Sequence, residues 1–202
     1  MADDDAPALD VVFGIAGTSV PVDYAFELAD AIARWLPWLV AEPGAGVHRL
    51  RTAPTGYGVA LLANRAKLAL RVPRQRLPDA LTLSGRTLDV GGSELVVGTG
   101  IPRPLQPWAT LHAAHVTAGA GDEAAFQEEV RLWLGTRGVA CEFITGRRRT
   151  VRAAEREIVG FSVVLHGLRP AASLRMQCEG MGTDRALGCG IFVPHKSIAA
   201  VA

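Results

Sequence analysis

The sequence predicts an α+β fold composed of two halves with the same order of elements. In each half a strand is followed by a helix, two strands, a second helix and a last strand, and a proline-rich segment, residues 101–107, lies between the halves. Apolar runs bounded by glycine or proline predict the strands, and apolar residues three and four apart predict the helices. The order βαββαβ is that of the ferredoxin-like (RRM-like) fold. We therefore expect tandem ferredoxin-like domains at residues 8–100 and 107–196, joined by a stiff linker.

In the first half, the leading strand is expected at Leu9–Ala16, an apolar run closed by Gly17-Thr18. The segment Asp23–Leu36 has apolar residues at helical spacing, and its aspartate can cap a helix that Pro37 ends. The later elements are expected as strands at Gly46–Arg51, Tyr57–Ala63 and Lys67–Val72, a helix at Pro73–Leu83, and a hairpin of Thr87–Val90 and Glu94–Val97 around Gly91-Gly92.

The second half repeats this order of elements, although its residues do not visibly repeat those of the first. Its clearest element is Asp122–Leu134, an amphipathic helix. The others are expected as strands at Ala109–Thr117, Val139–Ile144 and Gly190–Val193, a hairpin of Thr150–Arg152 and Ile158–Leu165, and a helix at Pro170–Glu179.

The composition indicates a globular protein of the cytoplasm. Hydrophobic residues make up 49% of the chain and charged residues 20%, which is too apolar for a disordered chain. No run approaches the roughly 18 apolar residues of a membrane helix. The three cysteines form no C-x-x-C pair, which favours free thiols in a reducing compartment over a zinc site. We expect neither a metal ion nor another cofactor.

The net charge of +1 conceals a basic region. Residues 1–46 contain eight acidic residues and one basic residue, whereas residues 47–202 contain 20 basic and 12 acidic residues. A basic excess of this size suggests a polyanionic partner. Almost all of the bases are arginine, whose planar fork suits phosphate groups and guanine edges. A GC-rich genome would give the same preference for arginine.

A glycine-rich segment, residues 180–192, is the most distinctive local pattern. Its glycines, among them Gly182, Gly188 and Gly190, permit positive φ and the close approach of another backbone. A loop of this kind before the last strand can present successive N–H groups to phosphate. An equally good interpretation is a helix C-cap at Gly180 followed by a tight turn into the strand.

Four arginines close together form the second candidate for phosphate binding: Arg147, Arg148, Arg149 and Arg152. On an extended strand Arg148 and Arg152 share one face with Thr150, and that face can follow a phosphate backbone or read a duplex groove. The alternative is a solvated hairpin tip.

His48 is the candidate for acid–base chemistry. Arg49 follows it directly, and Arg51 lies two residues further on. Metal-independent RNA cleavage needs a base for the 2′-hydroxyl or an acid for the leaving 5′-oxygen, and imidazole suits both near neutral pH. The arginines would stabilise the charge that develops on the phosphate. A histidine hydrogen-bonded within the fold is the alternative.

Several short segments together resemble one known family. They are Val11–Thr18, Pro21-Val22-Asp23, Leu36-Pro37, Gly46-Val47-His48, Leu70–Pro73, Arg147–Thr150, Glu157–Phe161 and Gly188–Phe192, and they span nearly the whole chain in order. The chain resembles the sixth CRISPR-associated protein family, the repeat-processing RNA endonucleases of the RAMP superfamily. It is most similar to the subgroup first described from myxobacterial CRISPR loci.

The resemblance implies metal-independent cleavage of precursor crRNA at the base of a repeat hairpin, by 2′-hydroxyl attack that gives a 2′,3′-cyclic phosphate. It matches His48 residue for residue, and we assign His48 as general acid or base. Members of the family often carry His-Gly after the aspartate, where this chain has Tyr24-Ala25, so Tyr24 is the candidate catalytic partner. We expect the RNA-binding residues to be Arg49, Arg51, Arg147, Arg148, Arg149, Arg152, Arg185, Gly182, Gly188 and Gly190.

Two other functions stay open. A non-catalytic subunit that binds repeat RNA within a CRISPR effector complex would be compatible with Tyr24, and other subunits of that complex would then be partners. A ferredoxin-like protein that holds a small phosphate compound at the glycine-rich segment is the more distant alternative. A gel shift with the cognate repeat RNA separates the last function from the first two.

Overall fold

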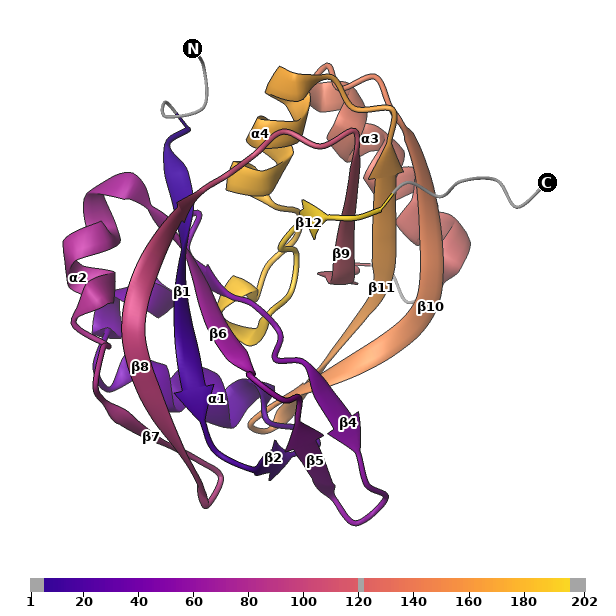
Figure 1. Ribbon diagram of the computed structural model, residues 1–202. Coiled ribbons are helices and arrows are strands. Elements are labelled where there is room, and N and C mark those ends of the chain that lie inside the picture. Colours follow the sequence, from indigo (N-terminus) through magenta and orange to yellow (C-terminus); the bar gives the residue numbers. More distant parts are fainter. Residues whose placement is uncertain (1–5, 120–121, 197–202) are drawn as a thin grey trace. The chain divides into compact units, whose positions relative to one another are not determined.

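The computed structural model describes residues 6–119 and 122–196 (Figure 1). The chain forms two compact units. The first contains the chain up to Pro104, together with Val151–Glu157 and Arg185–Gly188. The second contains Leu105–Thr150, Ile158–Asp184 and the chain from Cys189 onward. No helix in the described ranges is long and apolar enough to cross a membrane.

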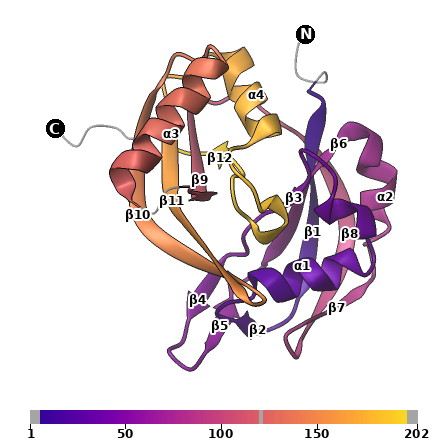
Figure 2. The same cartoon turned by 180° about the vertical axis from the view of Figure 1, so that it is seen from behind.

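The first unit is built on a five-stranded antiparallel sheet in the order β3-β6-β1-β8-β7. Its strands are β1 (Ala8–Ala16), β3 (Gly46–Val47), β6 (Lys67–Pro73), β7 (Thr87–Val90) and β8 (Ser93–Pro104). The helices α1 (Ala25–Ala33) and α2 (Leu77–Leu81) lie on one face of this sheet (Figure 2). In terms of a βαββαβ unit, β1 is the first strand, β3 the second, β6 the third and the β7–β8 hairpin the fourth. The order across the sheet is therefore second, third, first, fourth.

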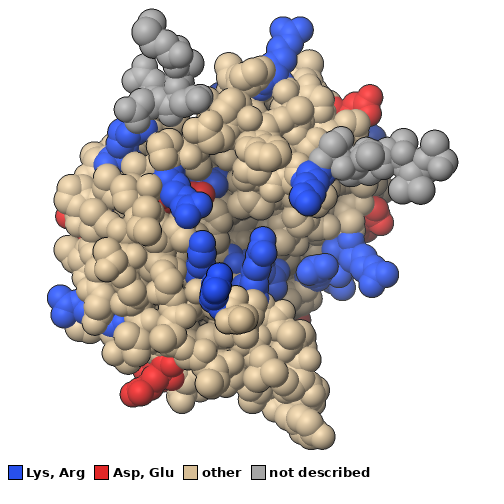
Figure 3. Space-filling model, viewed as in Figure 1, with Lys and Arg blue, Asp and Glu red and all other residues tan. Residues whose placement is uncertain are grey.

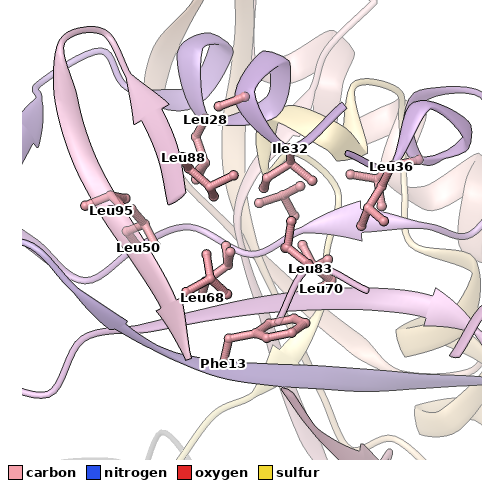
Figure 4. Close-up of a cluster of buried hydrophobic side chains, with 14 of the residues drawn as sticks. Phe13, Leu28, Ile32, Leu36, Leu50, Leu68, Leu70, Leu83, Leu88 and Leu95 are labelled. Atoms are coloured by element: carbon pink, nitrogen blue, oxygen red, sulfur yellow. The ribbon is translucent and has the colours of Figure 1, made fainter. Parts of the chain in front are cut away.

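Apolar side chains fill the space between this sheet and its helices (Figure 4). Leu28 and Ile32, which are four residues apart on α1, both face the core. In β1, Val11 and Phe13 are fully buried in the same core. Because side chains alternate along a strand, Asp10 lies on the other face, which carries no helix.

A second sheet of the first unit has three strands in the order β2-β5-β4. They are β2 (Ser19–Pro21), β4 (Thr52–Pro54) and β5 (Val59–Leu62). β4 and β5 form a hairpin, and β2 pairs with the other side of β5. The strand predicted at Tyr57–Ala63 therefore belongs to this small sheet and not to the one that contains β1.

The second unit has a four-stranded sheet in the order β10-β11-β9-β12. The helices α3 (Glu123–Thr136) and α4 (Pro170–Glu179) lie on one face of it (Figure 2). Phe126 of α3 stacks on Phe161, with 4.8 Å between the ring centroids. The strands are β9 (Thr110–Thr117), β10 (Glu142–Ala153), β11 (Arg156–His166) and β12 (Val193–Pro194). With β9 as the first strand, the order is again second, third, first, fourth, and the predicted tandem ferredoxin-like fold is confirmed.

Several boundaries differ from those predicted. β8 continues to Pro104, so the first part of the predicted linker is a strand that pairs with β1. On its other side the pairing with β7 ends at Val96, and Val97 still bonds to the backbone of Gly85 and Arg86. The prolines lie further along, and proline is tolerated where one side of a strand is open. β10 is one strand of 12 residues that includes the arginine run. The described residues also contain short 3₁₀ helices at η1 (Pro37–Val40), η2 (Arg74–Arg76) and η3 (Arg185–Leu187).

Candidate active site

His48 lies on the helix-free face of the first unit's main sheet, immediately after β3. Its backbone N–H donates to the carbonyl of Ala69 at 2.9 Å, which continues the pairing of β3 with β6. Its side chain is 15% exposed. The Nε2 atom lies 3.0 Å from Oδ1 of Asp10. The ring is therefore held by a carboxylate while part of it stays accessible.

Asp10 connects His48 to a buried arginine. Asp10 and Arg71 are directly opposite each other in the register of β1 and β6. Arg71 donates from Nε to Oδ1 at 2.9 Å and from Nη2 to Oδ2 at 3.0 Å, and its side chain is fully buried. Such a bidentate pair fixes the plane of the carboxylate as well as its position.

Asp10 is ionised under all ordinary conditions. Burial alone disfavours the carboxylate and would raise the pKa of Asp10. The positive charges of Arg71 and His48, with the hydrogen bonds that both make to the carboxylate, outweigh that effect and hold the pKa of Asp10 well below its usual range. Asp10 is therefore a fully charged acceptor, and Arg71 and His48 are its two donors.

The ionised carboxylate determines which nitrogen of His48 is left for chemistry. A carboxylate only accepts hydrogen bonds, so Nε2 is the donor and carries the hydrogen. The other nitrogen, Nδ1, can then take a proton from a ligand, or return one when it is protonated. The hydrogen bond from Nε2 to Asp10 fixes the orientation of the ring, and the hydrogen bonds from Arg71 fix Asp10.

Tyr24 lies at the N-terminal end of α1, and its hydroxyl is occupied by the backbone of Leu50. It accepts a hydrogen bond from the N–H of Leu50 at 2.8 Å and donates to the carbonyl of Leu50 at 3.3 Å. The side chain is 6% exposed. Burial raises the pKa of Tyr24, although the nearby charge of Arg49 opposes this. The hydroxyl therefore anchors the segment that follows His48.

The two arginines after His48 differ in their surroundings, although both are exposed. Arg49 interacts with the hydroxyl of Tyr24, and its Cγ would be 2.9 Å from a Cβ added at Gly188. A side chain at Gly188 would therefore displace Arg49. Arg51 precedes β4, outside this cluster.

The arginine run is exposed throughout and extends along β10. Arg147, Arg148 and Arg149 belong to the second unit, whereas Arg152 belongs to the part of the hairpin that is assigned to the first unit. Arg152 lies 3.7 Å from Asp23, and both side chains are more than half exposed. An exposed pair of this kind is worth little, so it leaves Arg152 available to a stronger anion.

The glycine-rich segment uses much of its backbone to close on itself. Gly188 donates to the carbonyl of Arg185 at 3.0 Å, and Gly190 donates to that of His115 at 2.7 Å. Gly190 also accepts from the N–H of Met181, and an added Cβ at Gly190 would lie 2.0 Å from the carbonyl oxygen of Met181. The need for glycine at this position is therefore explained by packing.

Other residues of the glycine-rich segment also use their hydrogen-bonding groups within the protein. Gly180 caps α4 with φ of 65° and donates to the carbonyl of Met176. Arg185 donates from Nε to the carbonyl of Ala45 at 3.1 Å and from Nη2 to that of Gly44 at 2.9 Å. Gly182 is exposed. Arg185 thus secures the loop that leads into β3 and His48.

The residues around His48 lie in a long basic stretch. Residues 43–78 contain seven arginine or lysine residues and no acidic one. The face in Figure 3 has many basic and few acidic side chains. Among residues 6–119 and 122–196, no group of three or more histidine, cysteine or acidic side chains could hold a metal ion.

The sequence prediction named His48 but neither Asp10 nor Arg71, which the structure places beside it. The available signal was a charged residue within each of two apolar strands, β1 and β6. A charge in such a strand has to be paired when it is buried. The pairing depends on the register of two strands that are about 60 residues apart, which the sequence alone did not provide.

Known proteins show similarity over nearly the whole chain. The family model described as Cas6 Crispr matches residues 9–197. The CRISPR-associated endonuclease Cas6 of Myxococcus xanthus (strain DK1622) is 37% identical over 194 residues, which cover 96% of this chain and 84% of that protein.

Solved structures agree with the fold at low sequence identity. A CRISPR associated protein Cas6 matches with a TM-score of 0.63 and 12% identity over 94% of this chain and 100% of that one. A RAMP protein that binds different RNA substrates matches with a TM-score of 0.60 and 12% identity over 92% of this chain and 98% of that one. The resemblance predicted from the sequence is confirmed: this chain belongs to the Cas6 family of CRISPR-associated proteins.

Proposed function

We propose that this protein is an endoribonuclease that binds CRISPR repeat RNA and cleaves precursor crRNA without a metal ion. The observation that carries the proposal is the Asp10–His48 pair, locked by Arg71 on a basic, helix-free sheet face. The Myxococcus xanthus relative is a CRISPR-associated endonuclease, which supports the same activity for this chain. The RNA repeat hairpin is the proposed substrate.

In the proposed reaction, the 2′-oxygen of the nucleotide before the cleavage point attacks the adjacent phosphorus. A new bond from the 2′-oxygen to phosphorus forms, and the bond from phosphorus to the 5′-oxygen breaks. The products are a 2′,3′-cyclic phosphate and a 5′-hydroxyl. Nδ1 of His48 takes the proton from the 2′-hydroxyl or gives one to the 5′-oxygen, and solvent water carries out the other of these two transfers. Asp10 stabilises the imidazolium that forms when Nδ1 accepts a proton.

The remaining predicted residues have supporting roles in this proposal. Arg49 is exposed next to His48 and would neutralise the charge on the scissile phosphate, whereas the exposed Arg51 would bind a phosphate further along the RNA. Tyr24 would act as a positioning residue, because its hydroxyl is bonded to Leu50. Arg185 would act indirectly, by holding the loop before β3.

The exposed arginines of β10 would bind the phosphate backbone of the RNA. They are Arg147, Arg148, Arg149 and Arg152. In the glycine-rich segment, Gly182 is the exposed candidate for contact with RNA, while Gly188 and Gly190 would shape the loop through their own hydrogen bonds.

The test is a denaturing gel of the cognate repeat RNA under single-turnover conditions, with excess EDTA. We expect cleavage to persist, because the chemistry needs only the 2′-hydroxyl and side chains. A repeat with a 2′-deoxy nucleotide before the cut should bind equally and stay intact. Activity that disappears with EDTA and returns with magnesium would contradict the mechanism.

A second candidate function is a non-catalytic subunit that binds repeat RNA in an effector complex with other CRISPR-associated proteins. It is favoured by Tyr24, which stands where family members often have histidine and whose hydroxyl is already occupied. The same gel decides: RNA that is bound in a mobility shift but never cut would establish the subunit and exclude the enzyme.

A further inference from the structure

The hairpin of β4 and β5 displays an aromatic side chain that the fold does not use. Tyr57 at its tip is 90% exposed, the most exposed of the large hydrophobic side chains in the described residues. It lies between Gly56 and Gly58, whose φ values are +88° and +71°. These glycines make the turn, so the turn itself does not require a tyrosine. Figure 1 shows the hairpin extending away from the strands of the main sheet.

The hairpin is well fixed below this tip. The N–H and the hydroxyl of Thr55 both donate to the carbonyl of Val59, at 3.0 and 2.8 Å. β5 is paired on both sides, with β4 and with β2. Tyr57 is therefore presented at the tip of a hairpin whose strands are held by pairing.

β5 presents apolar side chains to solvent beyond the turn that carries Tyr57. Val59 and Leu61 are 38% and 49% exposed, whereas Ala60 between them is buried at 1%. Because side chains alternate along a strand, Val59 and Leu61 lie on the same side of β5. The hairpin thus has an exposed apolar side on β5 and an exposed aromatic ring at its tip.

Basic residues flank this hairpin in the sequence, before β4 and after β5. Arg51 precedes β4, and its carbonyl accepts from the N–H of Ala63, so it lies level with the end of β5. Arg65 and Lys67 follow, and Arg65 adopts φ of +57° in the connecting turn. All three are exposed, and none of them forms an ion pair with another described residue.

This combination fits a nucleic acid better than a protein. An aromatic ring beside unpaired bases is how proteins bind single-stranded RNA, because every nucleobase has a face that can stack. Each partner in a stable protein interface contributes about 20–30 residues. This hairpin offers one aromatic and two aliphatic side chains. The absence of acidic residues from positions 43–78 favours a polyanion.

We propose that the β4–β5 hairpin is a binding site for single-stranded RNA, in which Tyr57 at the tip stacks on one unpaired nucleobase and Arg51 and Arg65 at the base contact phosphates further along the same strand. The site takes unpaired nucleotides, since a base inside a duplex does not offer its face to a side chain. The inference rests on the proposed function only in taking RNA as the ligand, and it is independent of whether the protein cuts that RNA.

The test measures the Kd for a repeat RNA with single-stranded flanks and a 2′-deoxy nucleotide at the cut, so that cleavage does not interfere. Tyr57→Ala should weaken binding about 5- to 150-fold, which corresponds to the roughly 1–3 kcal/mol of one base–aromatic stack. Tyr57→Phe and Tyr57→Trp should retain the affinity of the original protein within a few-fold, because both keep an aromatic face. Val40→Ala, which shortens another exposed apolar side chain (64% exposed) outside the hairpin, is the control.

Tyr57→Leu separates stacking from simple apolar contact. It should bind as weakly as Tyr57→Ala, whereas affinity retained by leucine would overturn the stacking site. Equal binding by Tyr57→Ala and the original protein would also overturn it, as would loss of a protein partner with no change in RNA affinity. If the original protein binds no repeat RNA at all, the proposed function is wrong. If it binds with a Kd that does not change when Tyr57 is replaced, only the stacking site is wrong.

Discussion

At the residue scale, one carboxylate controls both the orientation of His48 and the burial of Arg71. Arg71 is fully buried, and Asp10 supplies its compensating charge. Removing one member of a buried ion pair typically costs about 3–5 kcal/mol, because the other charge is left uncompensated. Asp10 is therefore needed for stability as well as for the proposed chemistry.

Asp10→Asn should change the pH dependence of stability in a defined way. The pKa of Asp10 is lower in the folded state than its usual value of about 3.9. As pH falls, the unfolded state therefore takes up this proton first, and the stability that Asp10 provides is lost. We expect the difference in free energy of unfolding between the original protein and Asp10→Asn to be constant above about pH 5 and to shrink below about pH 4.

Urea unfolding between pH 7 and pH 2.5 measures this difference. Glu94→Gln, which removes an exposed carboxylate from β8, serves as the control and should give a small difference at every pH. A difference for Asp10→Asn that does not change with pH would mean that Asp10 has no depressed pKa in the folded protein.

Tyr24→Phe tests positioning against direct catalysis. Loss of the hydroxyl leaves the N–H of Leu50 without its acceptor, which should lower the free energy of unfolding by about 1–3 kcal/mol. Cleavage should slow because the segment from His48 to Arg51 is less well held, but the shape of its pH–rate profile should not change. Tyr57→Phe, at the exposed tyrosine, should alter neither. Slower cleavage with unchanged stability and an altered pH–rate profile would make Tyr24 a catalytic residue.

At the element scale, β10 combines a structural strand with the exposed arginine run. Replacing Arg147, Arg148 and Arg149 by alanine should weaken binding of the repeat RNA and flatten its salt dependence. Each lost phosphate contact lowers the slope of log K against log salt by about 0.7–0.9. Arg131→Ala on α3, whose arginine already pairs with Glu128, is the control. Filter binding between 50 and 300 mM salt measures the slopes, and equal slopes would assign the run to a solvated tip.

The elements were predictable where one strand or helix buries one face. Asp122–Leu134 was predicted as a helix, and α3 spans Glu123–Thr136 with Asp122 accepting from the N–H of Ala125 at 2.8 Å. The small sheet was not predicted, because β2 is only three residues long and its partner β5 lies about 40 residues later. The Asp10–Arg71 pair was missed for the same reason, since long-range register is not encoded in local periodicity.

At the scale of the whole molecule, the two units have the same strand order but different chemical character. The first contains the proposed Asp10–His48 pair and the long segment without acidic residues. The second contains most of the arginine run. In each unit the larger sheet has its two α-helices on one face (Figure 2), and in the first unit Asp10 and His48 lie on the opposite face. The proposed activity therefore depends on a sheet face, and RRM domains also bind RNA on the face of their sheet.

The most direct measurement is the single-turnover cleavage rate of His48→Ala on the cognate repeat RNA, together with its Kd. Loss of a general acid or base typically slows a reaction by about 10²- to 10⁴-fold, so we expect a loss of that size with the Kd nearly unchanged. His166→Ala is the matched control, because His166 also pairs with a carboxylate, Glu142 at 3.0 Å, but lies in the second unit. It should cleave at the rate of the original protein. Normal cleavage by His48→Ala would contradict the assignment of His48 as the catalytic residue.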